Sequence, residues 1–531
     1  MTFRAATSAL TAIAFLSATA SMAAEPLPPK AVKEPSLYVQ CDGNPNNMAA
    51  GESIARLIAL TAVIGLLAPS PEQPDASKRK FGVDGVAACN GILNGDKGEH
   101  NVVRRIPFIL ARALHNIEAK SYDAAIADVG VARKEAGVAG LVGNPYFDRS
   151  MGLSFDLIES QALLRQGKVE EAREVNTRSA RRSPYSYFPL LLVRGMNVYS
   201  ANPLSAEEEA SLRNLSKISP SAIFGLAAQL DEARRFTESA AALKSLDDFQ
   251  KVAYHDNNSQ GIDLLIGTNV AVSLALAGDW TSAEAVDARN SALLATMRTE
   301  GKAIDNESII IERMDFYALV RMMREGKLNE ARRQFAARSR WTAPTFGQVL
   351  ELNRRLRAGA GKEDLFGSLA DDADAMIARR RQEAVAVRDE KDKNNKTLFS
   401  YILPYASVSG YERLSGRTWN AKGNRIISKD KRKDSEVYML SIFDADPMTQ
   451  PDILLLHAAL QAKARGKTGL VFRLIPDDPR IAFVYFADKG EAGVSDMQYL
   501  DADAVIADLG KIIPSPADLK AREAQRLKAR Q

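Results

Sequence analysis

The sequence predicts a mainly α-helical fold, in which an α-α superhelix of packed helix pairs is followed by a small C-terminal α/β domain. Between about residues 100 and 345, apolar residues recur with helical spacing and are interrupted by short polar turns. After residue 397 the period changes, and the β-type runs "VYMLSIF" and "GLVFRLI" flank an apolar helical segment. With 531 residues the chain exceeds one typical core, so more than one domain is expected.

Residues 1–23 have the composition of a secretory signal peptide, with one early arginine, an apolar run and small residues near its end. The run is shorter than a bilayer requires, so we expect cleavage and no membrane span afterwards. A second apolar run, Ile54–Leu67, is also too short and is expected to form a buried helix. The chain is therefore predicted to be a bacterial exported protein, periplasmic or secreted.

Two cysteines, Cys41 and Cys89, are the only ones in the chain. In an oxidising compartment such a pair predicts a disulfide, and neither residue has a CxxC neighbour or a nearby histidine that would suggest redox or zinc chemistry. We therefore expect residues 24–100 to form an N-terminal segment with a disulfide-clasped helix.

In the segment after Cys41, Asp42, Asn44 and Asn46 stand at every second position, as the first oxygen ligands of a calcium loop do. However, Asn47 and Ser53 stand where such a loop requires glycine and a bidentate glutamate. We interpret the segment as turn chemistry and predict no metal site.

Helix pairs are clearest in "FDLIESQALLRQGKVEEAREVNTRSARRSPYSY", where Gly167 occupies the turn and Pro184 ends the second helix. Four other segments have the same organisation. In all five a small residue lies near the start of the second helix: Ala125, Ala172, Ser239, Ala283 and Ala331.

This pattern resembles tetratricopeptide repeats, in which small residues occupy the contacts between paired helices. The resemblance implies a helical-repeat domain, which we place at residues 101–376. The five small residues are 47, 67, 44 and 48 positions apart, whereas the standard repeat has about 34. Longer helices or extra turns are therefore expected, including one more helix near residues 189–199. An alanine-rich amphipathic helix pair that is unrelated to tetratricopeptide repeats would also produce much of this pattern.

The first helices of stacked pairs normally line a concave surface. The predicted groove residues are Leu157, Gln161, Leu164 and Arg165 in one unit and Arg313, Phe316, Val320, Met323 and Arg324 in another. They would form a groove for a peptide or an apolar ligand, in which the arginines bind a carboxylate. In the alternative interpretation, the chain's own segments cover the apolar members.

Beyond the repeats we expect a charged linker at residues 377–396, a small α/β domain at residues 397–515 and a charged tail at residues 516–531. Within the α/β domain, the order strand, helix, strand suggests a parallel pair, which a hairpin strand then extends. The basic stretch Gly416–Asp434 is interpreted as a solvated loop, with an anionic partner such as a lipid head group as the alternative.

Signals for catalysis are weak, and no catalytic residue, cofactor site or metal site is predicted. "GKT" at residues 466–468 lacks the first glycine of a phosphate-binding loop and follows a helix rather than a strand. The four histidines form no spaced ligand set, and His457 is expected to lie in the core. The net charge of +4 gives no footprint of a nucleic-acid binder.

Taken together, these features predict an exported scaffold that binds a protein or peptide in the cell envelope, without nucleic acid and without a membrane span. The alternative is a cell-envelope hydrolase or carbohydrate-binding enzyme whose site lies between the repeat domain and the C-terminal domain.

Overall fold

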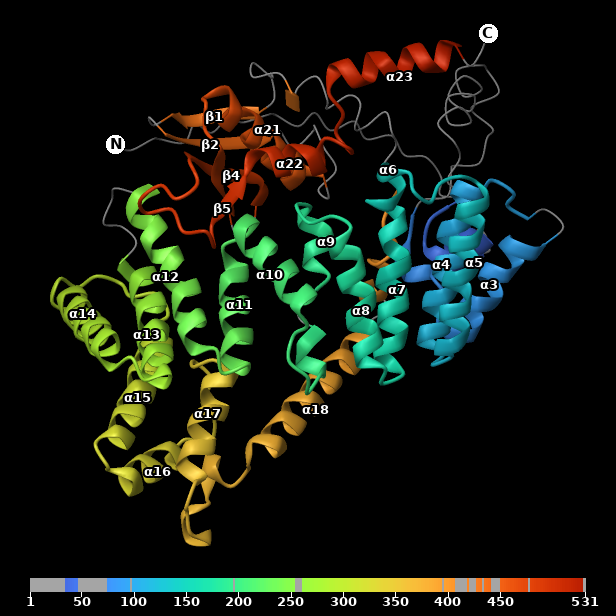
Figure 1. The fold of residues 1–531 in the computed structure, drawn as a ribbon. Helices are drawn as coiled ribbons and strands as arrows, with labels where there is room; N and C mark the ends of the chain where they lie inside the picture. The colour runs from blue at the N-terminus through green and yellow to red at the C-terminus, as the bar shows by residue number, and fades with distance from the viewer. Residues whose placement is uncertain are drawn as a thin grey trace, which may run out of the picture.

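In the computed structural model an array of helices carries a small sheet domain along one side (Figure 1). The residues described are 34–45, 74–95, 98–193, 196–253, 260–393, 396–405, 418–419, 426–431, 434–440, 449–475 and 478–528. The predicted class, mainly α with a small C-terminal α/β region, is confirmed. The predicted signal peptide and the run Ile54–Leu67 lie outside these residues. Among the helices described, none combines the length and apolar character that crossing a membrane requires.

The N-terminal unit is held together by the predicted disulfide. Cys41 of α1 (Leu37–Asp42) is bonded to Cys89 of α3 (Gly82–Asn94), with the Cα atoms 4.9 Å apart and both residues fully buried. His115 of α4 (Val102–Glu118) places its Nε2 atom 2.7 Å from the carbonyl oxygen of Cys41. The short 3-10 helix η2 (Ala76–Lys78) precedes α3. The disulfide and the histidine together fasten α1 to α3 and α4.

Five helix pairs form the array at the positions where the sequence predicts them. They are α4 with α5 (Tyr122–Val138), α7 (Met151–Arg165) with α8 (Val169–Arg181), α11 (Ser221–Glu232) with α12 (Phe236–Ala253), α13 (Gln260–Ala277) with α14 (Trp280–Thr299), and α15 (Glu307–Arg324) with α16 (Leu328–Ala337). Gly167 and Gly326 occupy the turns of two pairs with φ of +80° and +79°, a conformation that favours glycine.

A shared packing position explains the recurring small residues. Each of the five is the fourth residue of the second helix of its pair, and each is fully buried: Ala125, Ala172, Ser239, Ala283 and Ala331. A small side chain at this position lets the first turn of the second helix approach its neighbours closely. The helical pairing inferred from these positions is therefore confirmed.

Between the second and third pairs the chain is more broken than predicted. Instead of one helix near residues 189–199, it forms α9 (Tyr187–Leu191), the 3-10 helix η3 (Met196–Tyr199) and then α10 (Ala206–Ile218). Ser205 caps α10 in a capping box with Glu208. The short helix α6 (Pro145–Asp148) precedes α7, and α17 (Phe346–Arg357) follows the last pair. The 3-10 helices η5 (Lys362–Asp364) and η6 (Gly367–Leu369) come after α17.

Most of the segment 377–396, expected to be a charged linker, is a helix that ends at Asp392. Here the chain forms α18 (Ala373–Asp392), whose N-terminus is capped by the Asp372 carboxylate accepting from Ala375 N at 2.9 Å. The segment contains no glycine or proline and is rich in alanine, arginine and glutamate, all of which favour helices. It is followed by the short helix α19 (Lys396–Phe399).

The C-terminal sheet is antiparallel throughout, with the order β1-β2-β4-β3-β5. Its strands are β1 (Ile426–Lys431), β2 (Ser435–Leu440), β3 (Gly469–Ile475), β4 (Asp478–Ala487) and β5 (Tyr499–Asp501). The predicted parallel pair was wrong, because β4 is inserted between β2 and β3 and pairs with both, as a split β-α-β unit allows. The basic stretch interpreted as a loop contributes β1.

Among the residues described, this domain also contains the helices α21 (Gln450–Ala464), α22 (Ala502–Leu509) and α23 (Pro516–Lys528), the last within the predicted tail. The domain is docked on the array, since one apolar cluster combines residues of α10 to α13 with residues of the sheet and α21. At this interface Asp452 of α21 accepts from Arg149 Nη2 at 2.9 Å, from Tyr187 N at 3.1 Å and from the Ser186 hydroxyl. Burial raises the pKa of the Asp452 carboxyl.

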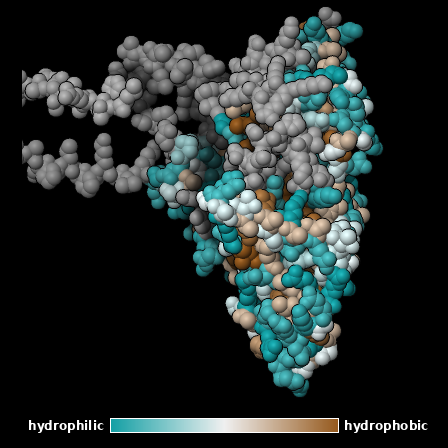
Figure 2. Space-filling view, turned by 90° about the vertical axis from the view of Figure 1, so that its left-hand side faces the viewer, coloured by the Kyte–Doolittle hydropathy of each residue, from teal (hydrophilic) through white to brown (hydrophobic). Residues whose placement is uncertain are grey.

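Figure 2 views the molecule from the side on which α14 lies in Figure 1. In Figure 2 hydrophilic residues cover most of its tapering lower end, and hydrophobic residues form only separate patches there. This end of the face therefore offers no continuous apolar surface.

Candidate functional site

Helix α18 runs from the α17 end of the array back to α7 and α8 (Figure 1). Near its middle, Arg380 donates two hydrogen bonds to the Glu232 carboxylate of α11 at 2.9 and 3.2 Å. At its last residue, Asp392 accepts from Arg165 of α7 at 2.6 and 2.7 Å. The helix thereby connects the third helix pair of the array with the second.

A pocket of about 640 Å³ lies between α18 and the ends of α7, α8 and η3. We call it the α18 pocket. Its walls are apolar at Leu164, Val169, Tyr199, Val385 and Ala386. Its charged members are Arg165, Arg381, Arg388 and Asp389, so three guanidinium groups face one carboxylate. An apolar slot with excess positive charge suits a ligand that carries both an apolar group and a carboxylate.

The three arginines differ in how fully they are engaged. Arg165 is almost fully buried and is neutralised by Asp392. Arg388 donates to its neighbour Asp389 at 2.8 and 3.0 Å and to the carbonyl oxygen of Leu164 at 3.4 Å. Arg381 donates through Nε to the carbonyl oxygen of Tyr199 at 2.9 Å.

Arg381 is therefore the cation with the most unused donor capacity in the α18 pocket. Among the residues described, no carboxylate is hydrogen-bonded or ion-paired to it, so its two terminal amino groups are available to a ligand. Tyr199 lies beside this group, and burial raises the pKa of its phenol, which keeps the phenol neutral.

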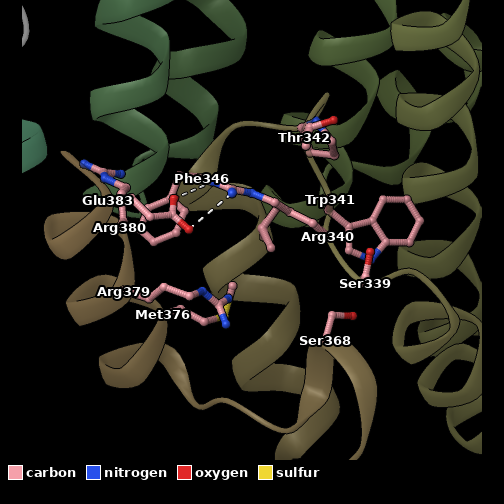
Figure 3. A pocket seen from close by; sticks show the side chains of 12 residues that line it. Ser339, Arg340, Trp341, Thr342, Phe346, Ser368, Met376, Arg379, Arg380 and Glu383 are labelled. Carbon is pink, nitrogen blue, oxygen red and sulfur yellow. Dashed lines mark hydrogen bonds and ion pairs between the residues drawn. The ribbon is translucent and has the colours of Figure 1, made fainter. Parts of the chain in front are cut away.

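A second pocket, of about 330 Å³, lies on another side of α18 against the segment before α17. Figure 3 shows Arg340 extending across it toward Glu383, to which it donates at 2.9 and 3.3 Å, while Trp341 and Ser368 lie on the opposite side. Arg379 is paired with Asp371 and Arg380 with Glu232. Each arginine of this pocket already has a carboxylate partner, so the α18 pocket is the better anion site.

The first half of the predicted groove is only partly assembled. Leu164 and Arg165 line the α18 pocket, and Gln161 accepts from Arg165 Nη1 at 3.0 Å, which orients the guanidinium. Leu157 instead packs against Leu403 in a small buried cluster. The groove on this side is thus covered by the segment that follows α18.

The second half of the predicted groove does not form an open surface. Phe316 and Val320 are fully buried in the core of the α13 to α17 region. Arg313 is partly buried and donates to the carbonyl oxygens of Ala343 and Leu265, at 2.8 Å each. It therefore ties α13 and α15 to the segment before α17, and two of its nitrogen atoms are already engaged in these contacts.

The two remaining groove residues of this half are at the edge of the same core. Met323 is partly buried there. Arg324 donates to Glu284 at 2.6 Å and lies over the Trp280 ring, 4.6 Å from its centroid. The alternative, in which the chain's own segments cover the apolar groove members, therefore describes this unit.

Arg381, Val385 and Arg388 were not among the predicted site residues, because they belong to the segment expected to be a charged linker. Its helical spacing is the signal that could have identified them. Spacings of three and four residues place Ala378, Gln382 and Val385 on one face of a helix, beside Arg381 and Arg388.

The two described histidines with side-chain contacts are structural. His115 lies between Cys41 and Glu118, whose carboxylate is 2.8 Å from Nδ1. His457 lies in the core as expected, with Nδ1 2.9 Å from the carbonyl oxygen of Thr418, and burial lowers its pKa. Among the residues described, no group of three histidine, cysteine or acidic side chains is placed to bind a metal ion.

The segment that resembles a calcium loop begins as a turn, because the Asp42 carboxylate accepts from Asn44 N at 2.8 Å. Its later positions, Asn47 and Ser53, lie outside the residues described. Comparisons of the chain with protein-family models, with curated protein sequences and with solved structures returned no match.

Proposed function

We propose that this chain is an exported helical-repeat scaffold that binds a protein or peptide partner of the cell envelope in the α18 pocket. The observation that carries the proposal is the Arg381 guanidinium, which has no carboxylate partner among the described residues and borders an apolar pocket of about 640 Å³. The occupant that fits is a peptide segment with an apolar side chain next to a carboxylate.

The scaffold part of the proposal rests on the helix pairs. Five small residues at equivalent, fully buried positions support a tetratricopeptide-like solenoid, a fold that commonly presents a preformed surface to a partner. Export rests on the composition of residues 1–23 and on the Cys41–Cys89 disulfide, which an oxidising compartment would maintain.

A ligand that places only one apolar side chain and one carboxylate in the pocket is expected to bind weakly. Burial of one leucine-sized side chain contributes about 1.5–3 kcal/mol, and a hydrogen bond to a charged group contributes about 1.5–3 kcal/mol. The sum, about 3–6 kcal/mol, corresponds to a dissociation constant on the order of millimolar before neighbouring contacts are added. Because the pocket walls are helical, no irregular segment of the wall has to fold when a ligand binds.

Site-specific photo-crosslinking in intact envelopes tests the proposal. A photoreactive residue at position 382, inside the pocket, is expected to capture a partner that the same residue at position 387 does not. Val387 is the matched control, because it is exposed on α18 but does not line the pocket. Equal capture at both positions, or none at either, would contradict the proposal.

The chemistry of the ligand is tested separately with purified protein and defined peptides. A fluorescent peptide mixture with a fixed Leu-Asp pair is expected to bind several times more tightly than its Leu-Asn counterpart, and Arg381→Gln should remove the difference. Arg333→Gln, an exposed arginine of α16, serves as the control and should leave it intact. If Leu-Asp and Leu-Asn peptides bind alike, Arg381 does not read a carboxylate.

A further inference from the structure

Helix α18 is fastened differently from the other long helices of the array. Only two of its twenty residues are buried, whereas ten of the fifteen residues of α7 are. Both buried residues, Ala373 and Met376, lie in its first turn and belong to the apolar core of the α13 to α17 region. From residue 377 to residue 392 no side chain is buried.

Just beyond its C-terminal end the chain is anchored again. Leu398 and Phe399 of α19 are buried in the apolar cluster of the N-terminal unit, where the Phe399 ring lies against His115. The helix is therefore held by apolar contacts before its second turn and after its last turn. Its long middle section, residues 377–392, makes no apolar contact through a buried side chain.

Ion pairs, hydrogen bonds and arginine–aromatic contacts hold most of that middle section, among them the Arg340–Glu383 pair and Arg380 over the Phe346 ring. The Arg380–Glu232 pair fixes it to α11, Arg381 donates to the Tyr199 carbonyl, and the Arg165–Asp392 pair fixes its end to α7. Ion pairs at partly exposed positions contribute little and weaken with salt. The Arg165–Asp392 pair is the strongest of them, since it is bidentate and the arginine side chain is only 4% exposed.

We propose that residues 377–392 of α18 form a hinged wall that opens and closes the α18 pocket, with the Arg165–Asp392 pair as its catch. Release of the catch would free the wall that carries Arg381, Val385 and Arg388, while the anchors at both ends keep the segment attached. This regulation rests on the proposed function for its purpose. A ligand that contacts both walls would favour the closed state by mass action.

Hydrogen exchange measured by mass spectrometry on the full chain tests the hinge without any ligand. In Asp392→Asn the amides of residues 378–391 are expected to exchange about tenfold faster than in the unaltered protein, because a nearly buried Arg165 loses its carboxylate. The amides of α7 should not change.

The matched control is Glu390→Gln. Glu390 forms an ion pair with Lys393 on the solvent side of the same helix, where both side chains are 72% exposed. This variant should leave exchange of residues 378–391 within twofold of the unaltered protein. In the unaltered protein, raising NaCl from 0.05 to 0.5 M should accelerate exchange of α18 but not of α7.

Two results would overturn the hinge. One is exchange of residues 378–391 in Asp392→Asn that stays within twofold of the unaltered protein, and the other is an equal acceleration in α18 and α7, which would indicate global destabilisation. Failure of the proposed function has a different signature. In that case α18 exchange follows the expectation, but Leu-Asp peptides and the photoreactive residue at position 382 find no partner.

Discussion

The protein should become less stable as the pH rises from 4 to 7, because the folded state holds Asp231 protonated and the unfolded state does not. This carboxyl, at the C-terminal end of α11, is fully buried, and its hydrogen-bonding partners are neutral. Thr345 Oγ1 donates to it at 2.7 Å and Ser273 Oγ at 3.3 Å. Without a cation to offset desolvation, burial raises its pKa from 3.8 to about 7.

The size of the effect follows from linkage between proton binding and folding. Because the folded state binds the proton more tightly than the unfolded state, the contribution of Asp231 is fully present below pH 4. It falls by about 1.4 kcal/mol per pH unit up to pH 7 and is then constant. The pKa shift from 3.8 to about 7 therefore corresponds to a loss of about 4 kcal/mol across this window.

Replacing Asp231 isolates its pH-dependent contribution to the free energy of unfolding. Asp231→Asn keeps a polar side chain among the same neutral partners but cannot ionise. Its free energy of unfolding relative to the unaltered protein should therefore rise by about 4 kcal/mol between pH 4 and pH 7 and then stay constant. Urea unfolding followed by circular dichroism at pH 4, 5, 6, 7 and 8 measures the difference.

Asp42 provides an internal comparison for this experiment. Burial raises the pKa of Asp42 to about 6. The free energy of unfolding of Asp42→Asn, relative to the unaltered protein, should therefore stop rising about one pH unit lower than that of Asp231→Asn. A difference between Asp231→Asn and the unaltered protein that does not change between pH 4 and pH 8 would refute the reasoning about Asp231.

Two further predictions concern the fastening of the fold. Reduction of the Cys41–Cys89 disulfide, or Cys41→Ser with Cys89→Ser, should lower the free energy of unfolding by about 4 kcal/mol, because the bond closes a loop of 48 residues. Urea unfolding with and without reductant measures this loss. Equal unfolding midpoints under the two conditions would contradict the prediction. Arg149→Leu should cost about 3–5 kcal/mol at pH 7 by leaving the Asp452 carboxylate buried and unpaired. The cost should become smaller as the pH is lowered, because protonation removes the unpaired charge, and a pH-independent cost would point to lost packing instead.

The helix pairs could be predicted because their determinants are local. Ala125, Ala172, Ser239, Ala283 and Ala331 repeat at one position of the second helix, and in three of the five pairs a turn glycine precedes them at short range. The disulfide was predictable for another reason, since only one pairing of two cysteines exists. In both cases the relevant information lies within a short segment or in the composition.

What could not be predicted depends on contacts between distant segments. Phe316 and Val320 have the spacing of groove residues, but the segment containing Trp341 covers them. The position of β4 between β2 and β3 depends on strand pairing, which the order of elements leaves open. Charge was also overweighted, because the helix-forming residues around Arg380 were interpreted as a linker.

The C-terminal end of α11 connects these observations, because three side chains within four residues fasten α17 and α18. Asp231 accepts from Thr345 at the start of α17, Glu232 is paired with Arg380 of α18, and Arg234 donates to the buried Glu351 of α17 at 3.0 Å. The first contact responds to pH and the second to salt, since one is a buried neutral network and the other a partly exposed ion pair. Raising the pH from 6 to 8 at low salt should therefore loosen α17 at its start without releasing α18, whereas salt at pH 6 should release α18 first.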